Sequence, residues 1–436
     1  MDKFKTLEKK IKSKTAVIGI IGLGYVGLPL TENYVNGGFK VIGIDSNPKK
    51  VNALKSGKSY IQDISSKSVK SLIKTKRFFP YSDFNKISDM DVIIICVPTP
   101  LRKSKDPDIS YILSALKEIT KRKYLGSLVI LESTTYPGTT EEILLPELSK
   151  NNLKVGKDFF LAFSPERVDP GNAVYLIKNT PKVVGGVTAK CTKLAALAYK
   201  SIINKVHEVS SPTVAETSKL LENIFRSVNI GLVNEMALLC NRMKINVWEV
   251  IEAAKTKPFG FMPFYPGPGL GGHCIPLDPF YLSWKARTYD FNARFIELAG
   301  EINGNMPYYV IDRIFEILNS NNKTIKKAKV LILGLAYKND INDMRESPSL
   351  DIFKLLVNKG AIVEYFDPYI PSVEIYEKKY KTIKDDYKKF KKYDIVVILT
   401  AHSKFDYKEI IKNSKCIYDT RNAIKTKRKI NKIHKL

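Results

Sequence analysis

The feature that most constrains the fold is a glycine-rich turn between two apolar segments near the start of the chain. Residues 15–21 form a continuous apolar, β-branched run, typical of a strand buried on both faces of a sheet. The turn follows as Gly22-Leu-Gly-Tyr-Val-Gly27, and a second strand at residues 40–44 ends at Asp45. A strand, this turn, a helix and a second strand ending in an acid together predict a dinucleotide-binding βαβ unit.

Each position of this turn has a physical role toward a dinucleotide. Gly22 permits the tight turn, Gly24 lets a pyrophosphate approach the backbone, and Gly27 allows close packing of helix on strand. Tyr25 and Val26 complete the turn where the helix begins, and a helix N-terminus offers N–H groups to phosphate. These five residues are the predicted phosphate contacts of the cofactor.

The acid at the end of the second strand favours NAD over NADP. Asp45 accepts hydrogen bonds from ribose hydroxyls and repels a 2′-phosphate. Lys49 and Lys50 follow closely and keep NADP open as an alternative, and Lys50 is included among the predicted cofactor contacts.

More βα units follow, with strands expected at residues 91–97, 128–131, 159–163 and 182–184. Polar residues stand just beyond three of them, namely Thr99, Thr134 and Glu166. Ligands of open parallel sheets bind at the carboxyl ends of the strands, so these side chains should line one cleft with the glycine turn. The alternative for each is a helix cap or a turn residue.

Residues 212–241 show apolar residues at helical spacing and predict one long helix. It is too long for a crossover helix, so we expect it to connect domains and to carry an oligomer interface. Lys219 and Asn223 lie four residues apart and therefore share one face of this helix. On a solvated helix that pairing would have no significance.

A run of residues from 265 to 281 is too rich in Gly and Pro to continue a helix or a strand. It carries Cys274 and, four residues later, Asp278. A thiol beside a carboxylate suggests a nucleophile with a proton-handling or water-orienting partner. The alternative is a rigid turn that holds an inert, buried Cys.

The C-terminal part repeats the opening pattern without the GxGxxG spacing. A strand at 329–333 runs into Gly334, a helix is expected over 347–358, and a strand at 362–366 ends at Asp367. This second unit is expected to bind a different phosphate-bearing ligand or a different part of it. Strands at 394–399 and 416–419 follow, and the lysine-rich tail from Lys425 is expected to be solvated.

The fold class predicted from these patterns is α/β, with two Rossmann-like, doubly wound parallel-sheet domains joined by a long central helix. The expected boundaries are 1–208 for the NAD-binding domain, 209–322 for the helical region with the Cys loop, and 323–436 for the second Rossmann-like domain.

Composition restricts the partners and the compartment. The net charge of +27 suggests either a nucleic-acid or acidic-membrane partner or a solvated surface covered with lysine. The second is favoured because lysines occur along the whole chain without a nucleic-acid-binding motif. Five widely spaced cysteines without a CxxC pair argue against disulfides and against a metal site, and favour a reducing compartment. The apolar segment near the N-terminus is too short and too rich in Gly for a membrane span, so we expect a cytoplasmic protein.

The combination of a nicotinamide cofactor and a thiol points to a particular reaction. Oxidation of an alcohol to an aldehyde requires no thiol. A Cys becomes useful when it traps the aldehyde as a thiohemiacetal, which is oxidised to a thioester and hydrolysed to an acid. The sequence therefore suggests a four-electron oxidation of an alcohol to a carboxylate.

At this point the chain resembles the UDP-sugar 6-dehydrogenase family over nearly its whole length. The motifs that carry the resemblance are Gly22-Leu-Gly-Tyr-Val-Gly27, Ser133-Thr134, Pro165-Glu166, Lys219-x-x-x-Asn223, Gly269-x-Gly-Gly-x-Cys274-x-x-x-Asp278, and Gly334-Leu-Ala-Tyr-Lys338 running to Arg345-Glu-Ser347. The segments Ser164–Gly171 and Gly271–Leu282 resemble the branch that oxidises N-acetylated hexosamines.

The resemblance implies roles for individual residues. Cys274 is the expected nucleophile, and Lys219 and Asn223 are expected to stabilise oxyanions. Asp278 and Glu166 are expected to handle protons and, with Thr134, to position water.

The remaining implied roles concern ligand binding. Arg345 is expected near the cofactor phosphate, and Thr99 and Thr134 in the cofactor cleft. The substrate contacts expected beyond the catalytic residues are Arg167, Gly271, Lys338 and Arg421.

The chain departs from the glucose-oxidising branch of the family at two places. Where that branch has a second Glu four residues after the first, this chain has Pro170, which cannot transfer protons. The base role must then pass to Glu166, Asp278 or a water, and that choice stays open. Where that branch carries basic residues, residues 259–265 are apolar and aromatic, and they could receive an N-acetyl group or pack an interface.

The resulting prediction is an NAD-dependent oxidation of C6 of a UDP-N-acetylhexosamine, with N-acetylglucosamine as the expected sugar, for surface polysaccharide. UDP-N-acetylmannosamine and UDP-glucose are the alternative substrates. A non-catalytic NAD-binding protein and a basic nucleic-acid binder are the alternatives of other classes. The expected partners are a UDP-sugar and a second copy of the chain, as a homodimer or a higher homo-oligomer, with no nucleic acid and no membrane.

Overall fold

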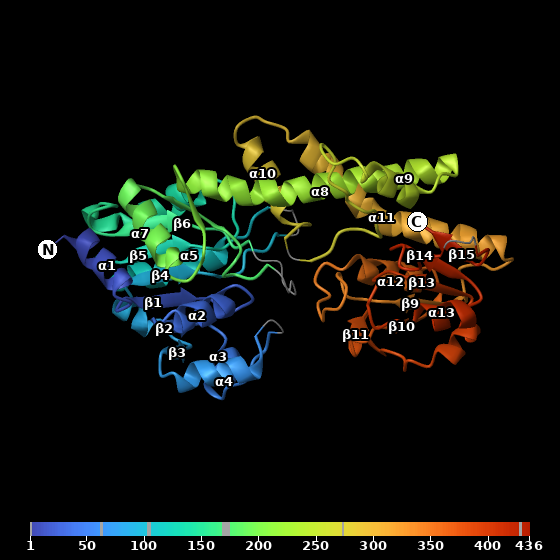
Figure 1. Cartoon of the computed structure of the whole chain (residues 1–436), viewed down its shortest axis with the longest axis horizontal. Coiled ribbons are helices and arrows are strands. Elements are labelled where there is room, and N and C mark those ends of the chain that lie inside the picture. Colours follow the sequence, from blue (N-terminus) through green and yellow to red (C-terminus); the bar gives the residue numbers. More distant parts are fainter. Residues whose placement is uncertain (1, 62–63, 103–105, 168–174, 273, 427–429) are drawn as a thin grey trace. The chain divides into compact units, whose positions relative to one another are not determined.

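The structure, a computed structural model, describes residues 2–61, 64–102, 106–167, 175–272, 274–426 and 430–436. The chain forms two compact units (Figure 1). Unit 1 comprises Met1–Glu222 and Trp284–Phe291, and unit 2 comprises Asn223–Ser283 and Asn292–Leu436. Among the described residues, no helix is both long enough and apolar enough to cross a membrane.

Unit 1 is built on an eight-stranded sheet with the order β3-β2-β1-β4-β5-β6-β7-β8. Its strands are β1 (Val17–Ile21), β2 (Lys40–Ile44), β3 (Phe78–Tyr81), β4 (Val92–Ile95), β5 (Leu128–Leu131), β6 (Phe160–Phe163), β7 (Lys182–Gly186) and β8 (Val206–Val209). The chain winds outward from β1 in one direction to β3 and in the other to β6, so the strand order reverses between β1 and β4. In open sheets of this kind the ligand crevice lies at that reversal, beyond the carboxyl ends of the strands.

The direction of β7 differs from the uniformly parallel set expected from the sequence. All neighbouring strands of this sheet pair in parallel except β6 and β7, which are antiparallel. The apolar pattern of residues 182–184 identifies a buried strand but carries no information on its direction. As a consequence, the first residue of β7 lies at the edge where β5 and β6 end.

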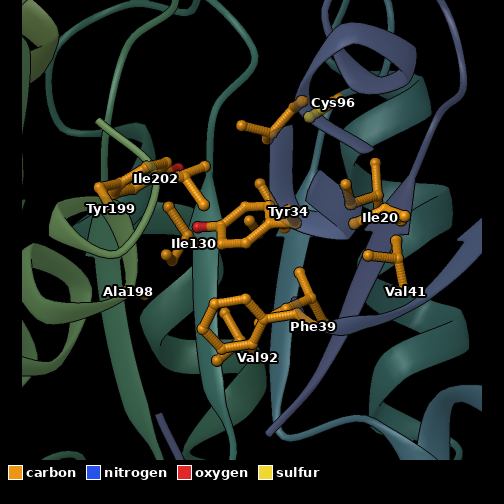
Figure 2. Close-up of a cluster of buried hydrophobic side chains, with 14 of the residues drawn as sticks. Ile20, Tyr34, Phe39, Val41, Val92, Cys96, Ile130, Ala198, Tyr199 and Ile202 are labelled. Atoms are coloured by element: carbon orange, nitrogen blue, oxygen red, sulfur yellow. The ribbon is translucent and has the colours of Figure 1, made fainter. Parts of the chain in front are cut away.

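Helices cover both faces of this sheet. One face is covered by α1 (Lys3–Lys12), α2 (Gly27–Asn36) and α7 (Ala189–Lys200), and the other by α5 (Ser110–Thr120), η2 (Thr139–Leu144) and α6 (Leu145–Leu148). The shorter elements α3 (Pro48–Lys55), α4 (Ser66–Lys74), η1 (Asn85–Asp89) and η3 (Lys150–Asn152) complete the unit. Figure 2 shows Tyr34 of α2 and Tyr199 of α7 within the core that covers the first face. The strands are thus covered by helices on both faces, as their continuous apolar sequences predicted.

The long helix predicted over 212–241 is α8 (Pro212–Met243). Its first residues belong to unit 1, and from Asn223 onward it belongs to unit 2. In unit 2 it packs closely on α11 (Arg294–Ser320), because a Cβ on Gly231 would lie only 3.3 Å from Cα of Ala299. The expected fold class, with two Rossmann-like domains and a long central helix, is confirmed.

Unit 2 holds a five-stranded parallel sheet with the order β10-β9-β13-β14-β15. Its strands are β9 (Lys329–Leu333), β10 (Ile362–Phe366), β13 (Ile395–Ile398), β14 (Ile417–Asp419) and β15 (Ile433–Lys435), with a separate hairpin of β11 (Ser372–Ile375) and β12 (Lys378–Lys381). The other helices are α9 (Val247–Ala254), α12 (Pro348–Asn358), η4 (Tyr387–Lys392), α13 (Tyr407–Asn413) and α10 (Asp278–Arg287), whose residues from Trp284 onward belong to unit 1.

The C-terminal tail is not solvated along its length, contrary to the prediction. Its last residues form β15 against β14, and Leu436 is buried. The Nε1 of Trp248 donates a hydrogen bond to the Leu436 carbonyl at 3.2 Å. The high lysine content of the tail concealed two apolar residues, Ile433 and Leu436, that cover an otherwise open sheet edge.

Candidate active site

The glycine turn of unit 1 has the geometry that a dinucleotide requires. Gly22 has a φ of +97°, and its N–H donates to the carbonyl of Ile44 at 2.7 Å. A Cβ at this position would lie 2.4 Å from the Cys96 carbonyl oxygen, so only glycine fits. The turn therefore joins the ends of β1, β2 and β4 closely.

The turn is packed on its inner side and open at its outer side. A Cβ on Gly27 would lie 1.9 Å from the Gly22 carbonyl oxygen, whereas a Cβ on Gly24 would meet no atom within 4 Å. No side chain caps α2 at Val26, and Tyr25 beside it is exposed. Backbone at Gly24 and the start of α2 thus offer a place for a diphosphate, as expected for NAD.

Asp45 occupies the position of a ribose-binding acid. Its carboxylate accepts hydrogen bonds from Leu23 N at 3.1 Å and from Asn47 N at 3.0 Å. The Nζ of Lys50 approaches the same carboxylate at 3.3 Å. Lys50 is therefore paired with the acid that repels a 2′-phosphate, and the predicted preference for NAD has a structural basis.

Two threonines stand beyond the strands next to the reversal of strand order. Thr99 is buried after β4, and Thr134 is half-buried after β5. Ser133 ties the two loops together, since its hydroxyl donates to the Val97 carbonyl at 2.7 Å. Both predicted contacts thus lie at the edge of the sheet where the cofactor crevice is expected.

Glu216, which the sequence did not single out, anchors the start of α8 to the loop after Thr134. Its carboxylate accepts hydrogen bonds from Gly138 N at 2.6 Å, and from Thr140 N at 2.9 Å and Oγ1 at 2.6 Å. Burial raises the pKa of Glu216 to about 6. Lys219, also buried, follows three residues later on the same helix. The position of the predicted oxyanion-stabilising lysine is therefore fixed within unit 1.

Glu166 lies beyond β6, with both carboxylate oxygens engaged. Its Oε1 accepts a hydrogen bond from Arg167 N at 2.7 Å, and its Oε2 lies 3.3 Å from the Nζ of Lys182. The Arg167 guanidinium donates to the Pro181 carbonyl at 2.7 Å and pairs with Glu222 at 2.7 Å. Arg167 thereby braces the segment that carries Glu166.

Behind Glu166 lies a charged cluster that sequence reasoning missed. Lys182 forms an ion pair with Glu132, and the Tyr199 hydroxyl donates to Glu132 at 2.5 Å. All three side chains are buried. The available signals were an acid directly after the strand at 128–131 and a lysine opening the strand at 182–184, which become meaningful only once β7 is known to run antiparallel.

In unit 2, three of the predicted catalytic residues form one contiguous group. The Asn223 Nδ2 donates to Asp278 Oδ2 at 2.5 Å, and both side chains are buried. Asp278 begins α10, and its N–H donates to the Cys274 carbonyl at 2.8 Å, so one helical turn joins the two residues. Cys274 is exposed, unlike the other four cysteines, all of which are buried. The burial that the alternative of an inert Cys expected is therefore wrong.

The Gly/Pro segment before Cys274 requires glycine at several points. A Cβ on Gly271 would lie 2.5 Å from the Tyr337 side chain, and one on Gly267 would lie 2.5 Å from Nη1 of Arg421. Gly272 has a φ of +84°, and its N–H donates to the Arg345 carbonyl at 2.9 Å. The loop of Cys274 is thus held against the C-terminal sheet domain by backbone contacts that a side chain would block.

Three cations predicted to contact ligands lie in unit 2. The Nε of Arg421 donates to the Leu399 carbonyl at 2.8 Å, and burial lowers the pKa of this guanidinium to about 10, which leaves it charged at neutral pH. Arg345 is exposed and pairs with Asp343 at 2.6 Å. Lys338 is half-buried shortly after the second glycine turn. Arg421 lies against Gly267 of the Gly/Pro segment. Some of the expected substrate contacts are therefore brought together within unit 2.

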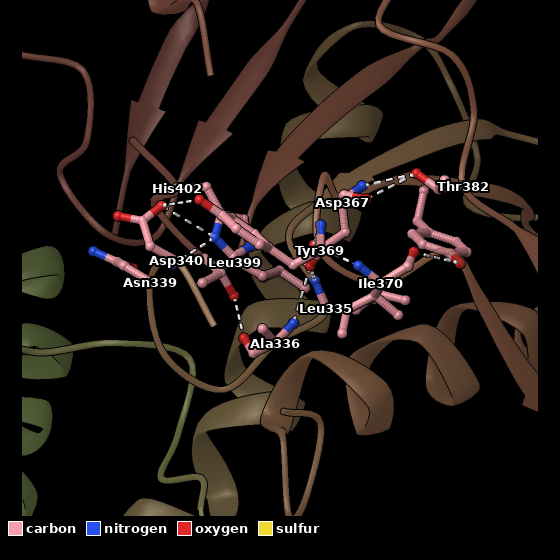
Figure 3. Close-up of polar contacts among 12 residues, drawn as sticks. Leu335, Ala336, Asn339, Asp340, Asp367, Tyr369, Ile370, Thr382, Leu399 and His402 are labelled. Carbon is pink, nitrogen blue, oxygen red and sulfur yellow. Dashed lines mark hydrogen bonds and ion pairs between the residues drawn. The ribbon is translucent and has the colours of Figure 1, made fainter. Parts of the chain in front are cut away.

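A second glycine turn, at Gly334, resembles the first, but the acid that it contacts, Asp367, is buried (Figure 3). Gly334 has a φ of +87°, and Leu335 N donates to Asp367 Oδ2 at 2.7 Å, as Leu23 N does to Asp45. Asp340 N donates to Nδ1 of His402 at 2.9 Å, and Nε2 of the same ring faces Asp367 at 3.1 Å. Because Asp367 and His402 are both fully buried, this acid is closed to a ribose.

The expected site residues are divided between the units. Thr134, Glu166 and Lys219 belong to unit 1, whereas Asn223, Cys274, Asp278 and the three cations belong to unit 2. His273 and Pro170 lie outside the described residues. Among the residues that the structure describes, no three His, Cys, Asp or Glu side chains are grouped so that they could hold a metal ion.

Comparison with known proteins gives matches along most of the chain. Residues 16–203, 213–305 and 331–426 match, respectively, the NAD binding domain, the central domain and the UDP binding domain of the UDP-glucose/GDP-mannose dehydrogenase family. The resemblance inferred from the motifs is thereby confirmed.

Individual relatives cover nearly the whole chain. A UDP-N-acetyl-D-mannosamine dehydrogenase of Methanococcus maripaludis is 35% identical over 93% of each chain. A UDP-N-acetyl-D-glucosamine 6-dehydrogenase of Pseudomonas aeruginosa is 35% identical over 90% of this chain and 92% of its own. The solved UDP-D-ManNAc dehydrogenase of Pyrococcus horikoshii has a TM-score of 0.87 at 33% identity, covering 96% of this chain and 98% of its own. The chain therefore belongs to the UDP-glucose/GDP-mannose dehydrogenase family and is an NAD-dependent oxidoreductase acting on a UDP-sugar.

Proposed function

We propose that this protein oxidises C6 of a UDP-N-acetylhexosamine, with UDP-N-acetylglucosamine as the first candidate, to the uronate in a four-electron reaction. One sugar CH₂OH, two NAD⁺ and one water become one carboxylate, two NADH and three protons. The family assignment supports an NAD-dependent oxidation of a UDP-sugar. The grouping of an exposed Cys274 with Asp278 and Asn223 supports the step from aldehyde to acid.

Cys274 carries this proposal because it supplies what an alcohol-to-aldehyde oxidation does not need. Cys274 is an exposed residue, while Asp278, one helical turn away, is buried and hydrogen-bonded to Asn223. A positioned carboxylate one turn from an exposed cysteine suits nucleophilic catalysis. The same pair has no role in a protein that only binds NAD.

In the first half of the proposed mechanism, the protein removes a proton from the C6 hydroxyl and captures the aldehyde. Bound NAD supplies the hydride acceptor for both oxidations. Asp278, Glu166 or a water held by them accepts the hydroxyl proton. The Cys274 sulfur then bonds to C6 and forms a thiohemiacetal, while Lys219 and Asn223 donate hydrogen bonds to the developing oxyanion.

In the second half, the thiohemiacetal becomes a thioester on Cys274 and water hydrolyses it. The attacking water loses a proton to a carboxylate, the C6–sulfur bond breaks, and the Cys274 thiolate leaves. Thr134 is proposed to orient this water with Glu166. A reducing cytoplasm suits this mechanism, since Cys274 must remain a thiol, and surface polysaccharide is the proposed destination of the uronate.

The apolar segment Phe259–Tyr265 supports an N-acetylated sugar. Phe259 and Met262 are 72% and 63% exposed, so this segment presents apolar surface that is not consumed by the core of unit 2. An acetyl methyl group gains free energy when such surface is covered. N-Acetylmannosamine is the second candidate, since relatives named for both sugars are equally similar to this chain.

A panel of UDP-sugars tests the proposal directly. Purified protein is given NAD and, separately, UDP-N-acetylglucosamine, UDP-N-acetylmannosamine, UDP-N-acetylgalactosamine and UDP-glucose, and NADH is followed by absorbance. We expect the highest kcat/KM with UDP-N-acetylglucosamine. A higher value with the mannosamine derivative would replace the first candidate by the second, and a preference for UDP-glucose would overturn the N-acetyl assignment.

A second copy of the chain is the proposed partner. In unit 2, α8 carries exposed apolar residues at positions 225, 232, 239 and 243, a spacing that keeps them along one face. Phe295 and Leu298 of the adjacent α11 are also exposed, at 79% and 51%. Apolar surface on two packed helices supports a homodimer formed through this face.

A further inference from the structure

The reversed direction of β7 brings a lysine to the ligand edge of the sheet in unit 1. Glu132 directly follows β5, and Glu166 follows β6 three residues after its end. β7 runs antiparallel to β6, so its first residue, Lys182, lies at the edge where β5 and β6 finish. A lysine at the start of a parallel strand would lie at the opposite edge.

The contacts of Lys182 link a buried core group to the half-buried Glu166. The ammonium forms ion pairs with Glu132 and, at 3.3 Å, with Glu166 Oε2. Side-chain exposure falls from 14% at Glu166 to 4% at Lys182 and 0% at Glu132. The Tyr199 hydroxyl holds the second oxygen of Glu132 at 2.5 Å. Tyr199 therefore holds Glu132, Glu132 holds Lys182, and Lys182 holds Glu166.

Lys182 is the counter-charge for both acids of the cluster. Burial raises the pKa of Glu132 to about 7, even though Lys182 opposes that shift. Burial disfavours charge on Lys182 as well, but the two carboxylates outweigh this effect and raise its pKa. Without the ammonium, two acids would face each other at a poorly hydrated site, and one would remain protonated at neutral pH.

Among the described residues, three other titratable groups that interact with this cluster are neutral. They are the Cys96 thiol beyond β4, the Tyr34 hydroxyl on α2 and the Tyr199 hydroxyl on α7, and burial raises the pKa of each (Figure 2). The Arg167 guanidinium, next in sequence to Glu166, is directed to Pro181 and Glu222. Among the described residues, Lys182 is thus a cation that forms an ion pair with the Glu166 carboxylate.

We propose that Lys182 is a positioning residue for hydrolysis of the thioester. Its ammonium holds Oε2 of Glu166 while the Arg167 backbone N–H holds Oε1, which fixes the carboxylate in one orientation and in its anionic form. Glu132 and Tyr199 in turn hold Lys182. The inference rests on the proposed function, and it favours Glu166 over Asp278 as the base of the final step.

The first test uses Lys182→Met in the full-length protein, with NAD and the best sugar of the panel. The expected kcat at pH 7 falls by about tenfold or more, because part of the contribution of a general base is lost, while KM for the UDP-sugar changes by less than about threefold. The thioester on Cys274 should accumulate and appear by mass spectrometry of the intact, acid-quenched protein. Lys182→Arg should restore most of kcat.

The second test measures the pH dependence of kcat. A variant that only lost stability would have a lower kcat without a shift of this profile along the pH axis. Glu166 acts as an anion, so kcat falls on the acidic side as it becomes protonated. Removing the lysine charge makes protonation easier and should move this acidic limb to higher pH. Adding Glu132→Gln removes the repulsion between the two acids and should return the acidic limb toward its wild-type pH. The double variant should also fold more reliably than Lys182→Met alone, because no buried charge is left unpaired.

Lys285→Met is the matched control. Lys285 is a similarly buried lysine of unit 1 that pairs with Glu142 at 2.7 Å and does not contact the cluster. It should keep the wild-type pH profile. The proposal is overturned if Lys182→Met keeps the wild-type profile with no accumulated thioester, or if kcat falls equally at all pH values and Glu132→Gln recovers nothing.

The failure of this inference can be distinguished from the failure of the proposed function. If the wild-type protein reduces NAD with no UDP-sugar of the panel, the proposed function fails. If the wild type turns over and Glu166→Gln leaves thioester hydrolysis unchanged, Glu166 is not the base and the role of Lys182 fails with it. If Glu166→Gln blocks hydrolysis and Lys182→Met does not, only the positioning role is wrong.

Discussion

Individual residues whose chemistry depends on their immediate neighbours could be predicted from the sequence. Gly22, Gly27 and Asp45 belong to one short βαβ unit, and their roles follow from spacing that the sequence displays. The observed clash distances at both glycines give that prediction its physical reason. Residues such as Lys182 and Glu216 were missed because their partners lie far away in sequence, and no local pattern indicates which strand end or loop they meet.

The preference for NAD can be tested at Asp45. Asp45→Ser removes the negative charge that opposes a 2′-phosphate and releases Lys50 from its 3.3 Å ion pair. The ratio of kcat/KM for NADP to that for NAD should rise by about tenfold or more, equivalent to a change of about 1.4 kcal/mol in relative transition-state stabilisation. Steady-state kinetics with both cofactors measures this ratio.

The matched control adds Lys50→Met to the same variant. If Lys50 supplies the new phosphate contact, the double variant should lose the gain in NADP use. An unchanged cofactor ratio in Asp45→Ser would show that Asp45 is not the ribose-facing acid.

At the scale of elements, strands and helices with strong periodicity could be predicted, but their pairing and direction could not. The α8 helix and the central strands of both sheets appear where the apolar patterns place them. The antiparallel pairing of β7 and the strand β15 depend on tertiary packing, and β15 was also obscured by its lysines. Short edge strands contain too few residues for period-two alternation to be distinguished from a loop.

Deleting residues 433–436 tests the structural role of β15. The truncation removes the strand that covers β14, the buried Leu436 and the carbonyl that accepts from Trp248 Nε1. Unit 2 should lose at least about 2 kcal/mol of unfolding free energy, from apolar burial and one buried hydrogen bond. Urea denaturation followed by circular dichroism measures the change.

Trp248→Phe provides the comparison for this truncation. It keeps an aromatic ring in the core but removes the N–H donor, so it separates the hydrogen bond from the strand. A truncated chain as stable as the full one would mean that β15 only lies on the surface and that the original expectation of a solvated tail holds in solution.

For the whole molecule, the order of motifs along the chain was more informative than composition. The net charge of +27 left nucleic acid open as a partner, whereas the sequence of glycine turn, Lys-x-x-x-Asn and Cys-x-x-x-Asp indicated the family that the comparisons confirm. The sugar could not be predicted with the same sharpness, because relatives named for N-acetylmannosamine and for N-acetylglucosamine are equally similar to this chain.

The proposed homodimer is tested by introducing charge into its apolar face. Leu232 is 55% exposed on α8, and Leu232→Lys would place an ammonium in the interface. Sedimentation at micromolar concentration should show a dimer for the wild type and mainly monomer for the variant, because burying an unpaired charge is unfavourable. Tyr376→Lys, at a 57% exposed position of the β11–β12 turn, should remain dimeric. A monomeric wild type would contradict this interface.

The central claim is that Cys274 enables the second oxidation. Its most direct test is the number of NADH molecules formed per UDP-N-acetylglucosamine when the sugar is limiting, measured for the wild type and for Cys274→Ser. We expect two NADH per sugar for the wild type. For the variant we expect a reaction that stalls after the first oxidation or holds the sugar covalently on the serine, without release of the uronate. Two NADH per sugar with free uronate from Cys274→Ser would show that Cys274 is not needed for the second oxidation.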